Sequence, residues 1–211
     1  IVAEKGFKRS QIQILDALLK LRQVCCHPSL LKLDSVKIGQ AHSAKLEQLM
    51  DMVVPMVEEG RKILIFSQFT SMLELIEQQL NHAEIGYVKL TGKTKKRDEV
   101  ITAFQSGQMP VFLISLKAGG VGLNLTAADT VIHYDPWWNP AAEDQASDRA
   151  WRIGQDKPVF VYKLITNQSI EEKIIVLQKN KAELAQSILS SDHDGEAKLT
   201  ENDVMKLFEK F

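Results

Sequence analysis

The sequence predicts an α/β fold built on a parallel β-sheet that is covered by helices on both faces. The first observation is order, because from residue 62 onward five short apolar segments alternate with amphipathic segments long enough to form helices. The second is the make-up of the short segments. KILIFS and VFLIS are nearly continuous apolar runs, as expected for strands with both faces buried. The third is size, since 211 residues with 45% hydrophobic content suffice for a full core.

Two helices are expected before the first strand. Apolar residues at helical spacing predict the first, with Ser10 as its N-cap. The pair His27-Pro28 ends it, because the residue before a proline is disfavoured in helical geometry. A second helix is expected after Ser43, and Gly60 ends it.

The strands are predicted from apolar runs and the later helices from capping signals. Ser71-x-x-Glu74 and Ser169-x-x-Glu172 are capping-box patterns, and Asn139-Pro140 places an N-cap before a proline at the first helical position. The expected strands are Lys62–Ser67, Tyr87–Leu90, Val111–Ser115, Thr130–Tyr134 and Val159–Ile165. The expected helices run from Ser71 to about Leu80, over Lys95–Gln105, from Pro140 to about Trp151 and from Ser169 to about Leu189, with a last short helix within Thr200–Phe211.

Composition limits the classes of function. With 26 Lys and Arg against 27 Asp and Glu, the net charge is −1, so any site for nucleic acid must be local. The only two cysteines, Cys25 and Cys26, are adjacent, which builds no disulfide framework or zinc pattern and suits a reducing compartment. No run reaches the roughly 18 apolar residues of a membrane span. The start, IVAEKGFKRS, lacks an initiator methionine and a signal-peptide pattern, which predicts a piece of a longer protein.

Ligands of an open parallel sheet bind beyond the carboxyl ends of its strands. The segments expected there are SQFT, TGKT, SLKAGGVGLN and DPWWN, whose hydroxyls, amides, glycines and lysines suit phosphate oxygens. Three glycines within SLKAGGVGLN favour either a tight turn or a backbone that approaches an anion. The chain contains no G-x-x-x-x-G-K-[ST] loop and no D-E-A-D or D-E-x-H box, so it lacks the parts with which a self-sufficient ATPase holds ATP and Mg²⁺.

The segment QASDRAWRIGQ places two arginines three residues apart. On a helix that begins near Pro140, Gln145, Arg149 and Arg152 fall on one face. Their repulsion is tolerable on a solvated surface or in the presence of a bound anion, and the glycine-rich loop favours the anion. The adjacent Trp137 and Trp138 are either packing aromatics or a platform beside a nucleotide or nucleic acid.

Together these segments resemble a known family. LRQVCCHP, ILIFSQFTSMLELIEQQL, YVKLTGKT, SLKAGGVGLNLTAADTVIHYDPWWNP, QASDRAWRIGQ and IEEKIIVLQ, in this order, are similar to the C-terminal motor lobe of Swi/Snf-type DNA-dependent ATPases of helicase superfamily two. The resemblance runs from about Leu18 to Leu189 and leaves Asp192–Phe211 without a matching motif. It implies a RecA-like lobe that pairs with a first lobe of the same kind, with ATP in the cleft between them and double-stranded DNA across both.

The resemblance also implies roles for individual residues. Arg149 and Arg152 match arginine fingers that reach the ATP phosphates, and Gln145 matches the leading glutamine of that motif. Gly120 and Gly122 match the loop beside the nucleotide. The residues that match DNA-backbone contacts are Ser67, Gln68, Gly92, Lys93, Ser115 and Lys117. The cofactor implied is ATP with Mg²⁺, the metal being held mainly by the missing first lobe, and no residue of this chain is assigned to a metal.

The resemblance divides the chain into a helical segment over 1–42 that links from the missing first lobe, a RecA-like lobe over 43–168, a brace helix over 169–189, and a linker with a short helix over 190–211. The expected function is the second lobe of a monomeric ATPase that translocates on duplex DNA, inactive as a fragment and without membrane association. The short segment 32–41 favours a compact prokaryotic member, which would be cytoplasmic; a eukaryotic member would be nuclear. A strand-separating helicase and a non-catalytic nucleic-acid-binding module remain alternatives.

Overall fold

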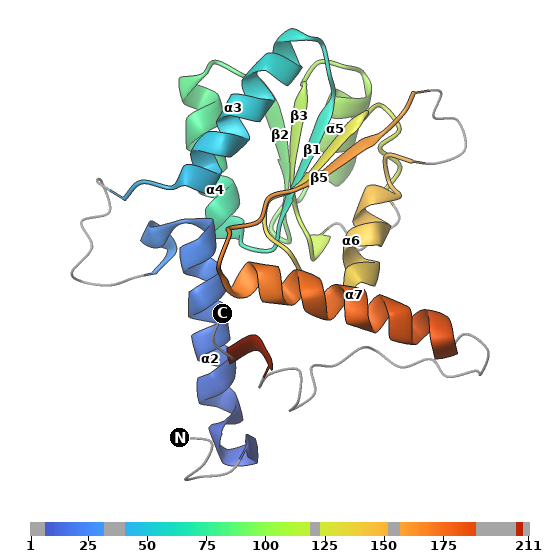
Figure 1. Cartoon of the computed structure of the whole chain (residues 1–211). Coiled ribbons are helices and arrows are strands. Elements are labelled where there is room, and N and C mark those ends of the chain that lie inside the picture. The colour runs from blue at the N-terminus through green and yellow to red at the C-terminus, as the bar shows by residue number, and fades with distance from the viewer. Residues whose placement is uncertain (1–6, 32–40, 119–122, 152–156, 189–205, 209–211) are drawn as a thin grey trace.

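A parallel five-stranded sheet forms the centre of the protein (Figure 1). The computed structural model describes residues 7–31, 41–118, 123–151, 157–188 and 206–208. All pairings are parallel and the strand order is β2-β3-β1-β4-β5, which confirms the predicted fold class. The strands are β1 Ile63–Ser67, β2 Tyr87–Leu90, β3 Val111–Ser115, β4 Thr130–His133 and β5 Phe160–Lys163.

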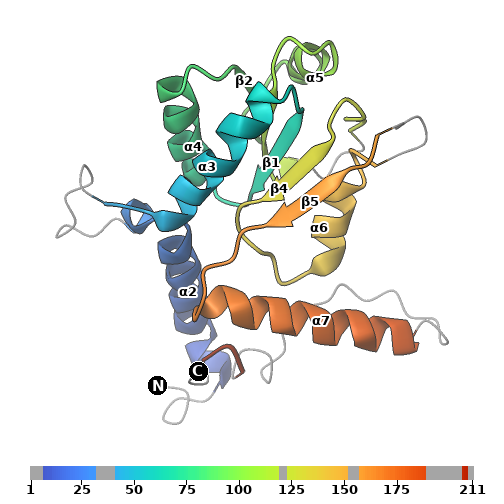
Figure 2. The same ribbon diagram turned by 45° about the horizontal axis from the view of Figure 1, so that its top comes forward.

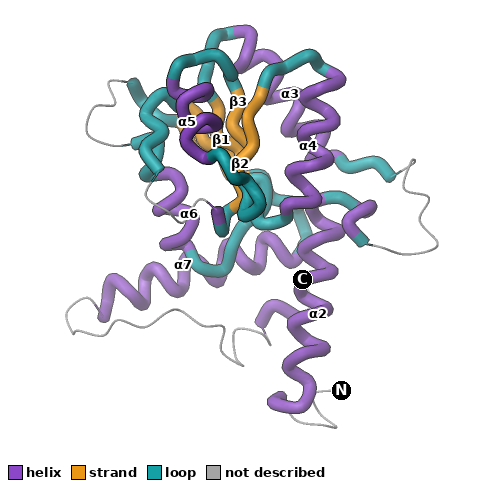
Figure 3. Tube along the Cα trace, turned by 180° about the vertical axis from the view of Figure 1, so that it is seen from behind, coloured by secondary structure: helices purple, strands orange, loops and turns teal. Residues whose placement is uncertain are grey.

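Helices cover both faces of this sheet, and two more lie beyond the ends of its strands. Figures 2 and 3 show α3 and α4 on one face, with α5 and α6 on the other. Two further helices, α2 and α7, lie beyond the ends of the strands (Figure 1). The helices are α2 Phe7–Cys26, the 3₁₀ turn η1 Pro28–Leu30, α3 Ala44–Glu58, α4 Thr70–His82, α5 Arg97–Gln105, α6 Pro140–Ser147 and α7 Ile170–Ile188.

The two faces of the sheet carry separate hydrophobic cores, because successive strand residues point to opposite sides. On β1, Ile63 and Ile65 pack with α3 and α4, whereas Leu64 and Phe66 pack with α5 and α6. A third cluster joins α2 to α7 and to Leu207, and Trp138 packs against it. The third cluster thus ties the helices beyond the sheet to the loop that follows β4.

The expectation that the strands are buried on both faces is wrong for the two edge strands, because β5 is largely exposed and three of the four residues of β2 are only half-buried. The side chains of β1, β3 and β4 are buried throughout, but Phe160 and Val161 of β5 are 43% and 46% exposed. Strand order explains the difference, because β5 is an edge strand with one neighbour, β4. Arg61 covers part of this edge, with its guanidinium 4.6 Å from the centre of the Phe160 ring.

Several local signals are confirmed at helix ends. The side chain of Ser43 accepts a hydrogen bond from the backbone of Leu46 at the start of α3, and Asn139 does the same for Ala141 at the start of α6. Gly60 follows α3 in the left-handed region, with φ of 80°, a conformation that glycine adopts without a steric cost. These residues therefore end and begin helices as their chemistry predicts.

Two predicted caps are wrong. Phe7, three residues before Ser10, is already part of α2, so Ser10 lies inside the helix. The capping box at Ser71 does not form, because α4 begins at Thr70 with Phe69 in the N-cap position. The cause lies upstream, where the hydroxyl of Ser67 accepts a hydrogen bond from the backbone of Phe69 at 3.1 Å and turns the chain early.

The second capping box forms in a modified way. The hydroxyl of Ser169 accepts from the backbone of Glu171 at 3.1 Å at the start of α7. The carboxylate of Glu171, and not that of Glu172, reaches back and accepts from the backbone of Thr166 at 2.8 Å.

Among the described residues, no helix is long and apolar enough to span a bilayer.

His133, the last residue of β4, gives the fold a pH dependence. Its imidazole is 2% exposed, lies 5.5 Å from the Phe66 ring, and its Nε2 is 2.9 Å from the Ser147 hydroxyl. Burial lowers the pKa of His133 to about 4, Glu143 opposes this shift and Lys163 adds to it.

We expect acid to weaken the fold through His133. Because the unfolded histidine titrates near pH 6.5, the unfolded chain binds the extra proton between pH 6.5 and pH 4. The stability that depends on the neutral ring is full above pH 6.5, and up to about 3 kcal/mol is lost as the pH falls to 4. Urea unfolding at both pH values measures this loss, and a His133→Gln variant should show a shallower slope. Equal slopes in the two proteins would contradict the prediction.

Candidate functional site

A cavity of about 550 Å³ lies at the carboxyl edge of the sheet. It is bounded by α2, by the loops that follow β1, β3 and β4, and by α6. This is the edge at which ligands of parallel sheets bind. The lining residues are Leu15, Leu19, Arg22, Gln68, Phe69, Leu116, Lys117, Trp137, Trp138, Ala142, Gln145, Ala146 and Arg149.

The polar part of this cavity is cationic. Its lining includes three basic side chains and two amides, and none of the described lining residues is an aspartate or a glutamate. Arg22 and Arg149 are each only 2% exposed, whereas Lys117 is exposed at the surface. A recess with apolar walls and buried arginines suits an anionic group, because attraction between opposite charges is stronger near buried groups than in bulk water.

Arg149 reaches the cavity by a route that differs from the sequence prediction. Helix α6 ends at Ser147 and not near Trp151, so Gln145 and Arg149 do not share one continuous helix. The carbonyl of Ser147 accepts from the backbone of Ala150 at 3.0 Å, which tightens the chain into a turn. The carbonyl of Arg149 accepts from Leu125 at 3.0 Å, and this long-range bond replaces the next helical one. The prediction of a single helical face is therefore wrong, although both side chains line the same cavity.

Three predicted site residues, Arg152, Gly120 and Gly122, lie outside the described residues. In the described parts of the same two segments, Lys117 and Arg149 line the cavity. Ser115, the last residue of β3, is 4% exposed, and its hydroxyl accepts from the backbone of Ala118 at 3.4 Å. Its side chain thus supports the turn that leads into the glycine-rich loop.

Ser67 and Gln68 direct their polar side chains towards Asp135, a residue that the sequence did not single out. The hydroxyl of Ser67 donates to Oδ1 of Asp135 at 2.5 Å, and Nε2 of Gln68 donates to Oδ2 at 2.5 Å. The backbone N–H of Gln68 also donates to Oδ2, at 3.3 Å. Burial raises the pKa of Asp135, while the bond from Ser67 and the charge of Arg22 oppose that rise. The position of Asp135, which follows the predicted fourth strand in DPWWNP, could have marked it as a residue of the site.

Arg22 was also missed, because nothing near it in the sequence shows its partners. Its guanidinium lies 4.5 Å from the centre of the Trp138 ring, 5.0 Å from Trp137 and 5.5 Å from Phe69. Arg22 Nη2 donates to the carbonyl of Pro136 at 3.1 Å and is 3.9 Å from Asp135. The two tryptophan rings pack against each other, with centroids 4.4 Å apart. The tryptophan pair is therefore both packed and part of the cavity wall.

A second buried acid, Glu143 on α6, joins four elements behind the cavity. Oε1 accepts from the backbone of Trp137 at 2.6 Å and from Gln178 of α7 at 2.9 Å. Oε2 forms an ion pair with Lys163 of β5 at 2.6 Å. Glu143 is 1% exposed, so these partners fix the orientation of the helix that presents Gln145.

Gly92 and Lys93 are in a different place, in the turn after β2, and do not line the cavity. Both are exposed. The turn is held by Thr91 and Thr94, since the backbone of Thr91 donates to the Thr94 hydroxyl at 2.9 Å. A side chain added at Gly92 would meet nothing within 4 Å, so the surface there is open.

Carboxylates suited to a metal do not gather at this site. The described residues contain no cluster of three or more histidine, cysteine, aspartate or glutamate side chains with the geometry to hold a metal ion. The donors that line the cavity are cations and amides, which fit phosphate oxygens and do not fit Mg²⁺. Any metal that accompanies a nucleotide here would need ligands from elsewhere.

Comparison with known proteins assigns this architecture to a family. The model of the helicase conserved C-terminal domain matches residues 44–154. The putative ATP-dependent helicase/translocase YwqA of Bacillus subtilis is 40% identical over 192 residues, which cover 89% of this chain and 21% of that protein. The ISWI chromatin-remodeling complex ATPase ISW1 of Saccharomyces cerevisiae is 37% identical over 201 residues, which cover 89% of this chain and 18% of that protein.

A solved structure agrees over almost the whole chain. The SWI2/SNF2 ATPase core of Sulfolobus solfataricus in complex with dsDNA superimposes with a TM-score of 0.72 at 38% identity, covering 98% of this chain and 43% of that one. The chain spans about a fifth of the length of the curated relatives it matches. The family model, these relatives and the parallel sheet agree, and the chain belongs to the helicase conserved C-terminal domain family as the RecA-like C-terminal lobe of a Swi/Snf-type protein.

Proposed function

We propose that this chain is the second lobe of a DNA-stimulated ATPase that translocates along double-stranded DNA. In this proposal ATP is bound between this lobe and a first lobe that carries the phosphate loop, the acidic box and most of the ligands of Mg²⁺. The observation that carries the proposal is the cavity at the carboxyl edge, which gathers Gln68, Lys117, Gln145 and Arg149 without an acidic side chain in its described lining.

The arginines supply the catalytic part of the proposal. Arg149 is buried at the cavity, where a guanidinium can stabilise charge that develops on a transferring phosphoryl group. Arg152 is proposed as the second arginine finger and Gln145 as the residue that senses the nucleotide. Gly120 and Gly122 are proposed to pass beside the nucleotide. Because these groups complete a site only with those of the first lobe, the chain alone is proposed to be inactive.

The DNA contacts are proposed on the same edge of the sheet. Lys93 and Lys117 are exposed cations suited to phosphate oxygens, and Gly92 leaves the backbone open to close approach. Ser67 and Gln68 are not proposed to donate directly to DNA, because the Ser67 hydroxyl and the Gln68 side-chain amide donate to Asp135. Both residues would therefore shape the loop after β1 rather than donate to DNA phosphate, and Ser115 would support the neighbouring turn.

The domain division follows from this proposal. Residues 1–42 would link from the first lobe, 43–168 would form the motor lobe, 169–189 the brace and 190–211 a linker with a short helix. The parent is proposed to act as a monomer on duplex DNA, in the cytoplasm of a prokaryote or in a nucleus. The ion pair and cap at Glu171 anchor the start of the proposed brace helix on the lobe.

An assay of the full-length parent protein tests the proposed function. ATP hydrolysis should rise on addition of duplex DNA, and the protein should displace a third strand from a triplex without separating the strands of the duplex. Duplex unwinding would instead identify a strand-separating helicase. Absence of ATP hydrolysis with DNA binding retained would identify a non-catalytic nucleic-acid-binding module.

A further inference from the structure

Arg22 of α2 occupies a buried aromatic enclosure at the floor of the cavity. Its side chain is 3% exposed, and the rings of Phe69, Trp137 and Trp138 lie within 4.5–5.5 Å of the guanidinium carbon. These rings come from two different loops, one after β1 and one after β4. A single side chain of α2 therefore holds two loops of the lobe together.

Asp135 extends this contact to the loop after β1. Its Oδ2 lies 3.9 Å from Arg22 Nη2, and the same oxygen accepts from both nitrogens of Gln68. Gln68 Nε2 also donates to the carbonyl of Pro136 at 3.3 Å, the carbonyl that accepts from Arg22. Gln68 is thus fixed by the same two acceptors that fix Arg22.

A purely structural role would be served better by apolar residues. Burying an arginine and an aspartate costs free energy through desolvation, and well-packed hydrophobic residues often stabilise such a position more. Other buried positions of α2 carry apolar residues, since Ile14 and Leu18 pack into the cluster with α7. The charged pair instead fixes the orientation of neighbouring groups, because planar side chains that form hydrogen bonds hold their partners in one geometry.

We propose that Arg22 is a positioning residue, which acts through Asp135 and the tryptophan pair to hold Gln68, and through Gln68 the loop after β1, in the geometry that DNA binding requires. Helix α2 is then a working part of the DNA-binding edge and more than a link to the preceding lobe. The DNA part of this inference rests on the proposed function, whereas the positioning of Gln68 stands apart from it.

Hydrogen exchange in the full-length parent protein tests the positioning directly. In Arg22→Lys, which keeps the charge but loses the planar fork, the Gln68 backbone N–H should exchange about tenfold faster, as expected when a hydrogen bond to a charged acceptor is lost. Lys20→Ala is the matched control, because Lys20 lies on the same helix and its ion pair with Asp16 is exposed. Unchanged exchange at Gln68 in Arg22→Lys would overturn the proposal.

The DNA concentration for half-maximal stimulation of ATP hydrolysis tests the consequence. Arg22→Lys and Gln68→Ala should each raise it by about tenfold, and the double variant should raise it no further, because both release the same loop from Asp135. A general loss of stability would act differently, lowering the melting temperature and adding to the effect of Gln68→Ala. Additive effects in the double variant would therefore overturn the proposal.

A second variant covers the case in which Arg22→Lys does not fold. Asp135→Asn keeps the size of the side chain and removes its charge, and it should give the same faster exchange at Gln68 and the same lack of additivity with Gln68→Ala. Normal exchange in Asp135→Asn would overturn the proposal. If the unaltered parent shows no stimulation by DNA, the proposed function fails, and the exchange measurement still decides the role of Arg22.

Discussion

Arg149→Ala in the full-length parent protein is expected to lower kcat for ATP hydrolysis by about a thousandfold or more, the effect of removing an arginine finger. The guanidinium lines the cavity from a turn after α6, and Arg149 is only 2% exposed. Duplex DNA binding should persist, because the arginine is expected to face nucleotide phosphate. Steady-state hydrolysis at saturating DNA and a filter-binding titration measure the two effects.

Two further variants show whether Arg149 acts through its geometry. Arg149→Lys keeps the charge in the buried site but loses the bidentate fork, so most of the loss in kcat should remain. Lys117→Ala should do the opposite, weakening DNA binding in a salt-dependent way while kcat at saturating DNA changes little. Loss of DNA binding with normal hydrolysis in Arg149→Ala would mean that this arginine faces DNA.

Lys45→Met is expected to lower the free energy of unfolding of this chain by about 3–5 kcal/mol, because it leaves a buried carboxylate without its counter-ion. Lys45 Nζ contacts Glu171 Oε2, and the two side chains are 6% and 1% exposed. The ammonium also donates to the carbonyls of Tyr134 and Leu164, at 3.4 Å each. Urea denaturation measures the loss.

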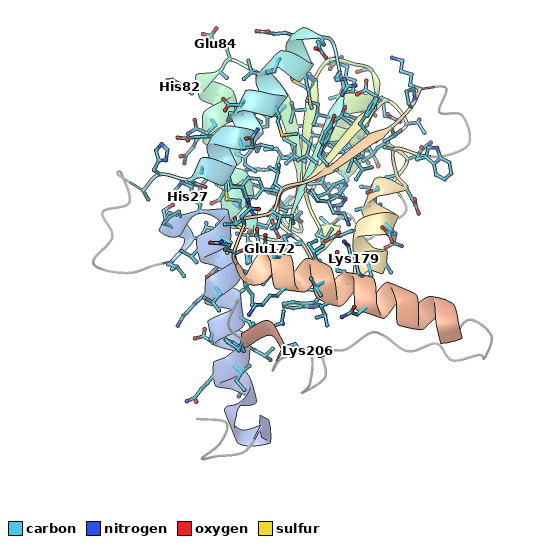
Figure 4. The ribbon with its side chains drawn as sticks, in the orientation of Figure 1. His27, His82, Glu84, Glu172, Lys179 and Lys206 are labelled. Carbon is cyan, nitrogen blue, oxygen red and sulfur yellow. The ribbon has the colours of Figure 1, made fainter. Side chains whose placement is uncertain are left out.

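The paired variant isolates the buried charge as the cause. In Lys45→Met with Glu171→Leu, both charges are gone and most of the stability should return, since an apolar pair avoids desolvation. Lys179→Met on α7 is the control, because Lys179 is exposed on the same helix (Figure 4) and should change stability little. If Lys45→Met costs no more than Lys179→Met, the ion pair does not anchor α7.

The sequence predicted the sheet well because strand burial leaves a local signature. The runs around Ile65 and Leu113 are apolar up to a final serine, and both are buried between two layers of helices. Helix ends were predicted where a single side chain decides them, as with Asn139. They were missed at Ser71 and Ser147, because bonds to residues outside the helix redirect the chain there.

The sequence predicted those residues of the candidate site that stand in local motifs and missed those that are defined by long-range contacts. Gln145, Arg149 and Lys117 stand in segments whose pattern alone marks them, and the cavity brings them together. Arg22 lies 114 residues before Pro136, whose carbonyl accepts its hydrogen bond. Asp135 directly precedes Pro136, so it is equally remote from Arg22 in the sequence. Both residues stand in motifs, LRQVCCHP and DPWWNP, but the sequence does not show that the fold brings them together and buries them.

ATP turnover by this chain alone, by the isolated first lobe and by the joined parent protein, each with saturating duplex DNA, tests the central claim most directly. If the nucleotide site is shared, only the joined protein hydrolyses ATP at a DNA-stimulated rate, and Arg149→Ala abolishes that rate. DNA-stimulated turnover by this chain alone, or by a parent that carries Arg149→Ala, would contradict the account.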